Sequence, residues 1–203
     1  MYREVSCVAS EASRRLHIVL QLRRYYNVPA IFRLYKAHVL PFIERSTPAI
    51  FHACSSILRL LDNVQSNCLD VVQSSSKDVL LQFNLAPLHC RRHIGMLGLI
   101  HKTQLGLAPS CLSQFFPKAS STLYKFSVGC RPVHDRQVAC HASSSCPVIF
   151  KRSVFALVQV YNKLPAEAVE AVSVSIFQRR LQEMLKTSAK GNMQNWHDLF
   201  NIV

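Results

Sequence analysis

Residues 161–186, YNKLPAEAVEAVSVSIFQRRLQEMLK, contain the clearest secondary-structure signals in the chain. Ser175 and Gln178 have the capping-box spacing, in which the side chains of a serine and of a residue three positions later satisfy backbone groups at a helix start. The pattern predicts a helix that begins near Ser175, with residues 166–172 as a short link and Pro165 closing an earlier helix. The apolar face of the predicted helix is formed by Phe177, Leu181, Met184 and Leu185.

The same helical periodicity appears along most of the chain, without the alternation that is typical of strands. The other expected helices cover residues 10–26, 30–40, 55–72, 79–84, 87–106, 109–116 and 152–165. Pro41 is expected to kink or stop the second of them, because proline has no N–H to donate. Only 5 glycines are present, which also favours helices over a strand-rich sandwich. The sequence therefore predicts an all-α protein, an irregular helical bundle of about seven helices.

Residues 117–150 differ from the rest of the chain, because they are rich in serine, cysteine and small residues and lack a sustained period. Such a composition is typical of loops. We therefore expect a long Ser/Cys-rich loop that is partly ordered at best. The predicted organisation is a helical region over 1–116, this loop over 117–150, and a C-terminal helical segment over 151–203 that packs on the first region.

The composition excludes a disordered chain and argues against a membrane-spanning or secreted protein. Of the 203 residues, 49% are hydrophobic and 17% are charged, which is too apolar for a disordered sequence. No apolar run approaches the roughly 18–20 residues that cross a bilayer, and Arg14 and Arg15 interrupt the only candidate signal peptide. We expect an intracellular protein, in the nucleus or the cytoplasm. Its mean hydropathy of +0.13 indicates apolar surface that meets another domain or partner.

The 8 cysteines are scattered, and several lie inside helical patterns. Because no secretion signal accompanies them, reduced and mostly buried thiols are a better interpretation than disulfides.

Lysine and arginine number 24 against 11 aspartate and glutamate, for a formal net charge of +13. Such an excess attracts polyanions, nucleic acid above all, although a solvated basic surface without a ligand has the same composition. Arginine suits phosphate because its guanidinium donates two parallel hydrogen bonds. The candidate nucleic-acid-binding residues are the basic residues that cluster on expected helices: Arg14, Arg15, Arg23, Arg24, Arg33, Lys36, Arg91 and Arg92. Aromatic residues interleave with them only modestly, so sequence-specific stacking on single strands has weak support.

The residues do not form a recognisable catalytic site. Asp62, Asp70 and Asp78 recur every eight residues, but on one helix that spacing is about 12 Å and cannot hold a metal pair. We interpret them as solvated helix surface or caps. None of the common nucleophile, phosphate-loop or metalloprotease motifs is present. The sequence therefore predicts no enzymatic activity and no cofactor.

One patch within the expected loop, CRPVHDRQVACHASSSC, contains possible metal ligands. A tetrahedral zinc site would draw on Cys130, His134, Cys140, His141 and Cys146. The gaps between these residues match no standard zinc finger, and C-x-x-C is absent. A Cys–His catalytic dyad from the same residues has still less support, because no orienting partner is evident. The preferred interpretation is a loop that binds no metal.

Three stretches together resemble one protein family. They are LYKAHVLPFIERSTPAIFHACSSILRLLDNVQ at 34–65, LAPLHCRRHIGMLGLIHKTQLGLAP at 85–109 and VYNKLPAEAVEAVSVSIFQRRLQEML at 160–185. In this order they resemble the region that follows the polymerase palm in reverse transcriptases of non-LTR (LINE-type) retrotransposons. The matching features of the first stretch are Tyr35, Lys36, Ala37, Pro41, Glu44, Pro48, Leu60, Leu61, Val64 and Gln65. Tyr161 stands where many members of the family have tryptophan.

The resemblance implies a helical thumb and the segment beyond it, which would grip the backbone of a template–primer duplex. The family's catalytic Tyr-x-Asp-Asp motif and endonuclease domain do not occur in this sequence. The resemblance thus implies a non-catalytic fragment or relic of an RNA-directed DNA polymerase that retains non-specific nucleic-acid binding. Its possible partners are RNA or DNA backbone, and the missing palm domain or another protein. The alternatives are a protein-interaction module with exposed apolar helices, a zinc-dependent module, and a chain without a selected function.

Overall fold

The computed structural model describes residues 2–121, 123–125, 133–139, 147–191 and 193–201. The predicted all-α class is confirmed, since the described residues form helices and no strand; Lys118 and Val138 form an isolated bridge. Several helices have only four or five residues, too short for periodicity to predict.

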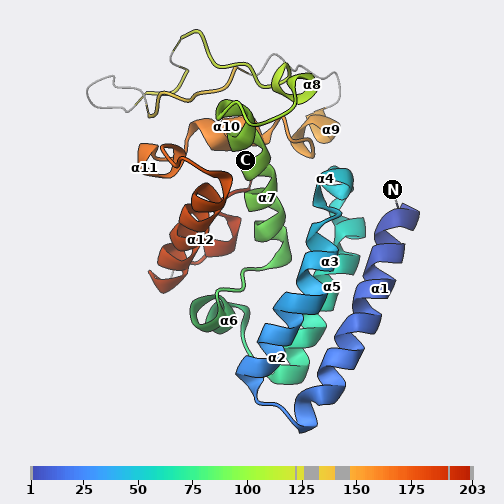
Figure 1. Cartoon of the computed structure of the whole chain (residues 1–203). Coiled ribbons are helices and arrows are strands. Elements are labelled where there is room, and N and C mark those ends of the chain that lie inside the picture. The colour runs from blue at the N-terminus through green and yellow to red at the C-terminus, as the bar shows by residue number, and fades with distance from the viewer. Residues whose placement is uncertain (1, 122, 126–132, 140–146, 192, 202–203) are drawn as a thin grey trace. The chain divides into compact units, whose positions relative to one another are not determined.

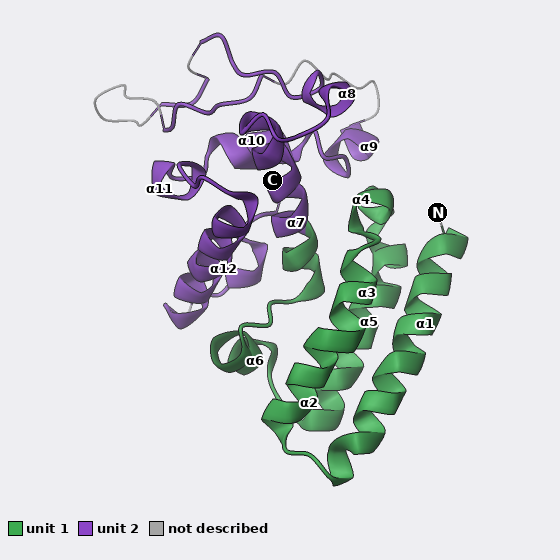
Figure 2. Cartoon of the chain, viewed as in Figure 1, with its two compact units in different colours: residues 1–92 green, residues 93–203 purple. Residues whose placement is uncertain are grey.

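The chain divides into two compact units, residues 1–92 and 93–203 (Figure 2). The elements of unit 1 are α1 (Tyr2–Gln21), η1 (Leu22–Arg24), α2 (Val28–Leu34), η2 (Tyr35–Val39), α3 (Leu40–Glu44), α4 (Thr47–Ile50), α5 (Ser55–Val72) and α6 (Ser76–Phe83). The helix α7 (Leu88–Gln104) contains the division between the units. The elements of unit 2 beyond it are α8 (Ser110–Ser113), α9 (Pro147–Lys151), α10 (Leu157–Asn162), α11 (Ala166–Val169), α12 (Val174–Lys190) and η3 (Trp196–Asp198). The boundaries expected after residues 116 and 150 both lie within unit 2.

In unit 1, α1 packs along α5, and the helical stretch from α2 to α3 packs against α1 (Figure 1). The first helix is longer than residues 10–26 predicted, because Val5 and Ala9 extend its buried stripe toward the N-terminus. The core between these helices is formed by buried side chains that recur at helical spacing: Ala12, Leu16, Val19, Ile31, Tyr35, Val39, Leu61, Val64 and Cys68.

The helical path continues through Pro41, where the sequence predicted a kink or a stop. The residues just before it form the π turn η2, in which the Leu40 N–H donates to the Tyr35 carbonyl five residues earlier. Pro41 then occupies the first turn of α3, the place where a missing N–H leaves no helical bond unmade. The wider π turn thus allows one continuous helical segment to accommodate the proline.

Two further predictions about the chain after residue 165 are wrong. The helix cap is Ser173, whose hydroxyl accepts from the Ile176 N–H at 3.3 Å, and α12 begins at Val174. Ser175 lies inside the helix, because extended backbone, which a capping residue needs, occurs at Ser173. The expected link over 166–172 contains the short helix α11.

The bounds of α5 and α7 agree closely with the sequence, whereas α6 begins three residues before the expected 79–84 and α10 is shorter than the expected 152–165. α5 begins at Ser55 as expected. Ser75 caps α6 by accepting from the Asp78 N–H at 3.1 Å. α7 ends just before Gly106, which has a φ of +70° that favours glycine.

In unit 2, the core includes Leu97, Ile100, Tyr161, Phe177 and Leu181, all fully buried. The described parts of the expected loop over 117–150 lack long helices, as predicted, but they are not loosely attached. The side chain of Asn162 accepts from the Val138 N–H and donates to the Val138 carbonyl, each at 2.9 Å. The Asn162 amide thereby satisfies both backbone polar groups of Val138, which is buried.

None of the helices in the described part of the chain has both the length and the apolar character that a membrane span needs.

Candidate nucleic-acid interface

Arg91 and Arg92, at the start of α7, are engaged in ion pairs within unit 1. Arg92 donates to both carboxylate oxygens of Asp62 on α5, at 2.7 and 2.9 Å, and is only 6% exposed. Arg91 is paired with Glu44 at the end of α3. Both guanidinium groups therefore hold helices together. Arg92 has little capacity left for an external phosphate, whereas Arg91 uses only its Nε in its pair. Sequence reasoning grouped them with the exposed arginines because their partners lie on other helices.

Arg14 and Arg15 lie on α1 and both bind Glu11. Their hydrogen bonds lower the pKa of the Glu11 carboxyl. Arg15 also lies over the ring of Phe42, 4.2 Å from its centroid, and Arg45 lies 4.4 Å from the same centroid. Arg14 and Arg15 are exposed, so their positive charge faces water although one carboxylate partly offsets it.

Lys36 and Arg33 lie on the helical stretch that follows. The Lys36 ammonium donates to the Phe83 carbonyl at 2.9 Å, where α6 ends. Cations suit this position, because the last carbonyls of a helix carry partial negative charge. Arg33 is exposed.

Arg23 and Arg24 lie in η1, at the turn between α1 and α2. We refer to residues 22–27 as the α1–α2 turn. Arg23 Nη1 donates to the Val71 carbonyl of α5 at 3.4 Å. Among the residues that the structure describes, no carboxylate forms an ion pair with Arg23, Arg24 or Arg33. These three arginines therefore present uncompensated positive charge.

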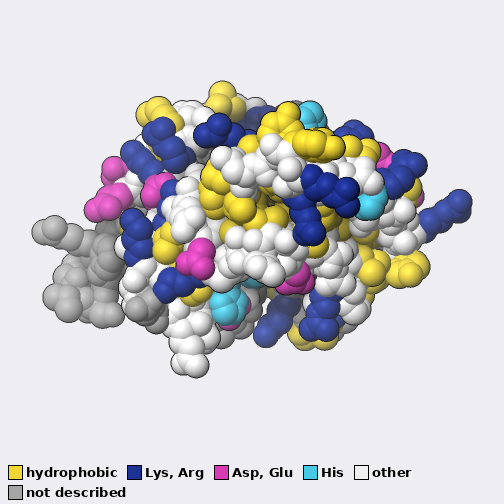
Figure 3. All heavy atoms as spheres, turned by 90° about the horizontal axis from the view of Figure 1, so that it is seen from below, with side chains coloured by type: hydrophobic (Ala, Val, Ile, Leu, Met, Phe, Trp, Pro, Cys, Tyr) yellow, Lys and Arg dark blue, Asp and Glu magenta, His cyan; other side chains and the backbone are white. Residues whose placement is uncertain are grey.

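A hollow of about 590 Å³ adjoins the α1–α2 turn. Its lining comes from the last turns of α1, from the turn itself and from the end of α5: His17, Leu20, Gln21, Arg23, Arg24, Tyr25 and Val71. Figure 3 views the molecule from below, the side on which this turn lies in Figure 1, and basic side chains there lie beside hydrophobic ones. The structure thus brings the two arginines of the turn together with exposed aromatic and apolar groups at one end of unit 1.

The metal-site candidates fall mostly outside the described residues, namely Cys130, Cys140, His141 and Cys146. His134 is described; it is buried, and its Nε2 donates to the Tyr161 carbonyl at 3.1 Å. The described part of the chain contains no group of three or more potential metal ligands. Five described cysteines, Cys7, Cys54, Cys68, Cys90 and Cys111, form no disulfide bond; only Cys68 and Cys90 are buried, so the prediction of mostly buried thiols is wrong for these five.

A buried polar network in unit 2 joins α7 to α10. His101 Nε2 lies 3.1 Å from the Ala171 carbonyl, which can only accept, so Nε2 carries the hydrogen of the neutral ring. Nδ1 then accepts from the Tyr161 hydroxyl at 3.0 Å. The Phe177 ring stacks on the imidazole at 4.2 Å between centroids. Burial lowers the pKa of His101 and raises that of Tyr161. Since the whole network is enclosed, its contribution is to the stability of the unit.

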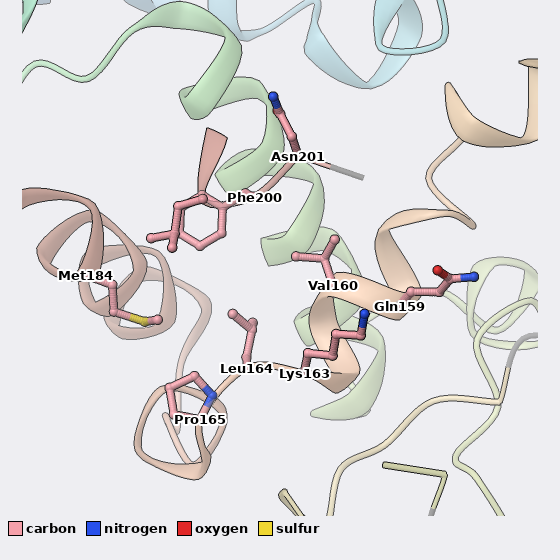
Figure 4. Close-up of a pocket in the computed structure, with 9 residues that line it drawn as sticks. Gln159, Val160, Lys163, Leu164, Pro165, Met184, Phe200 and Asn201 are labelled. Carbon is pink, nitrogen blue, oxygen red and sulfur yellow. The ribbon is translucent and has the colours of Figure 1, made fainter. Parts of the chain in front are cut away.

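A second hollow, of about 270 Å³, lies in unit 2 (Figure 4). The apolar side chains of Leu164, Met184 and Phe200 surround it, and Lys163 is its charged lining residue. The lining contains no carboxylate, histidine or cysteine, so Lys163 has no partner there for acid–base or nucleophilic chemistry.

No protein-family model, no curated protein and no solved structure matches this chain.

Proposed function

We propose that this protein binds nucleic acid through the phosphate backbone, without base specificity, on the basic surface of unit 1. The observation that carries the proposal is the exposure of Arg23, Arg24 and Arg33 without carboxylate partners among the described residues. Arg14 and Arg15 on α1 add to the same charge. Uncompensated guanidinium groups bind phosphate bidentately and displace its counterions.

We further propose that the protein has no catalytic activity of its own and derives from the C-terminal region of a LINE-type reverse transcriptase. The support is the order of the three sequence stretches described above, together with the absence of the Tyr-x-Asp-Asp motif from the sequence. The dispersed carboxylates agree with this view. Asp62 is paired with Arg92, and Asp78 accepts from the Ser75 hydroxyl at 2.6 Å.

The test is the salt dependence of binding to a fluorescently labelled duplex. The logarithm of the association constant is expected to fall linearly with the logarithm of salt concentration. The double variant Arg23→Gln/Arg24→Gln removes two phosphate contacts, so the slope is expected to become shallower by about two.

The matched control is Arg179→Gln/Lys190→Gln, which removes the same charge from exposed positions of α12 in unit 2. This control is expected to keep the slope of the unmodified protein. An association constant that does not change between low and physiological salt would contradict the proposal. Equal salt slopes for the two double variants would show that the binding surface is not on unit 1.

A second candidate function is docking to a protein partner through apolar surface. It is favoured by large apolar side chains that are exposed on several helices and loops: Ile18, Leu107, Phe115, Val148 and Ile149. Concentration-dependent oligomers that form equally with and without nucleic acid, measured by light scattering, would favour this candidate.

A further inference from the structure

The α1–α2 turn exposes two neighbouring tyrosines directly after its two arginines. Tyr25 is 81% and Tyr26 52% exposed, whereas Tyr35 and Tyr161 are fully buried. Tyrosine side chains usually bury most of their ring and leave only the hydroxyl in water. Two rings that face solvent beside two guanidinium groups combine a stacking surface with an anion-binding group.

The backbone holds this turn in one conformation. The Leu22 carbonyl accepts from the N–H of Tyr25 at 2.9 Å and from that of Tyr26 at 3.0 Å. Asn27 then caps α2 by accepting from the Ala30 N–H at 3.1 Å. Because the backbone beneath the rings is already ordered, a ligand that stacks on them loses less conformational entropy on binding.

The hollow beside Tyr25 has polar and apolar walls. Gln21 Nε2 donates to His17 Nε2 at 2.9 Å, so the wall carries an amide and an imidazole whose remaining polar atoms can meet a base edge. Leu20 and Val71 supply apolar surface. Its volume of about 590 Å³ lies within the roughly 300–1,000 Å³ that is usual for small-molecule sites.

These features together fit a nucleotide whose base is not paired. In a duplex, the base faces are covered by neighbouring bases, and only phosphates and groove edges are accessible. In a single strand, each base has a free face that can stack on an aromatic ring, while the adjacent phosphate meets a cation. Arg24 and Tyr25 both line the hollow, so a phosphate and the base attached to it would meet neighbouring side chains there.

We propose that the α1–α2 turn binds an unpaired nucleotide of single-stranded nucleic acid, with its base stacked on Tyr25 and its phosphate bound by Arg24. This inference rests on the proposed function and narrows its substrate to strands with unpaired bases. Tyr26 and Arg23 contact the next nucleotide.

The experiment measures binding by fluorescence anisotropy. The labelled probes are an oligothymidylate DNA strand of about twelve nucleotides, an oligouridylate RNA strand of the same length, and a blunt duplex of that length. Tyr25→Ala is expected to weaken single-strand binding by roughly five- to tenfold and to leave duplex binding unchanged. Since stacking releases no counterions, the salt slope of this variant is expected to equal that of the unmodified protein. Arg24→Gln is expected to reduce the single-strand slope by about 0.7.

Two matched variants complete the test. Tyr25→Phe retains the ring and is expected to bind single strands like the unmodified protein. Tyr2→Ala removes a tyrosine that is 63% exposed at the start of α1, far along the sequence from the turn, and is also expected to have no effect. Circular dichroism checks that each variant retains its helices.

The outcomes separate this inference from the proposed function. If the unmodified protein binds single strand and duplex with equal affinity, and Tyr25→Ala behaves like Tyr2→Ala, the inference is overturned while backbone binding stands. If the unmodified protein binds neither nucleic acid, both are overturned. If Tyr25→Ala instead abolishes self-association without changing single-strand binding, the turn is a protein contact and the inference is likewise wrong.

Discussion

The guanidinium of Arg92 binds the carboxylate of Asp62 through two parallel hydrogen bonds, and so joins the second turn of α7 to the middle of α5. Arg92 is buried, whereas the Asp62 side chain is 30% exposed. Removing one partner of such a pair leaves a desolvated charge without compensation.

Arg92→Met is therefore expected to lower the free energy of unfolding by about 2–4 kcal/mol. The double variant Arg92→Met/Asp62→Leu is expected to lose less than Arg92→Met alone, since it leaves no unpaired charge. Urea denaturation followed by circular dichroism measures both. If Arg92→Met unfolds at the same urea concentration as the unmodified protein, the pair does not stabilise the fold.

The two fully buried tyrosines, Tyr35 and Tyr161, differ in what their hydroxyls contact. The Tyr35 hydroxyl has no hydrogen-bond partner among the described residues, and burial strongly raises its pKa. The Tyr161 hydroxyl donates to His101. Tyr35→Phe is expected to be neutral or to stabilise by up to about 1 kcal/mol, and Tyr161→Phe to destabilise by about 1–2 kcal/mol. Thermal unfolding of the two variants under one condition gives the comparison, and equal effects would contradict the assigned contacts.

Acid is expected to destabilise unit 2 through its buried histidines. Burial lowers the pKa of His101 and of His134 below the ordinary value of 6.5. Near and below pH 6.5 the unfolded chain therefore binds more protons than the folded chain, so stability is fully present above that pH and is lost as the pH falls through it. The measurement is the urea midpoint from about pH 7.5 to about pH 5.

The control for this titration is His52→Gln, which changes an exposed histidine and is expected to leave the pH dependence intact. His101→Gln is expected to flatten it, whatever its stability at neutral pH. A pH profile that is the same in all three proteins would show that His101 does not cause the acid sensitivity.

The start of α12 provides a direct comparison of two serines. Ser173→Ala removes the hydroxyl that accepts from the Ile176 N–H and is expected to cost about 1 kcal/mol. Ser175→Ala, two residues later, is expected to cost less, although its hydroxyl lies 3.2 Å from that of Ser173. Chemical denaturation of both variants decides between the two caps, and a larger loss for Ser175→Ala would restore the capping box that the sequence suggested.

Local chemistry predicted the long helices of this protein well. The apolar stripe over 55–72 gave the correct bounds for α5, because this signal acts over a few neighbouring residues, whereas α6 begins at Ser76, three residues before the expected 79–84. His101 lies within the expected helix 87–106 and is buried there. The same local signals are ambiguous where two serines compete for one cap, as at Ser173 and Ser175.

The candidate site was harder to predict, because ion pairing depends on residues far apart in the sequence. Arg91 and Arg92 look like Arg23 and Arg24 in the sequence, yet only the first pair finds carboxylates on other helices. Exposure of Tyr25 and burial of Tyr35 also follow from tertiary packing, since both belong to helical patterns of similar hydrophobicity.

The π turn η2 also affects the way length changes in this segment act on unit 1. A π turn contains one residue more than an α-helical turn, so Tyr35–Val39 incorporates an additional residue without interrupting the helix. Deleting the exposed Ala37 would convert this turn to regular α-helix, in which Leu40 still follows Tyr35 by one turn, so Leu40 and Ile43 would keep their direction relative to Ile31. This segment can therefore lose one residue without changing which side chains on α3 enter the core.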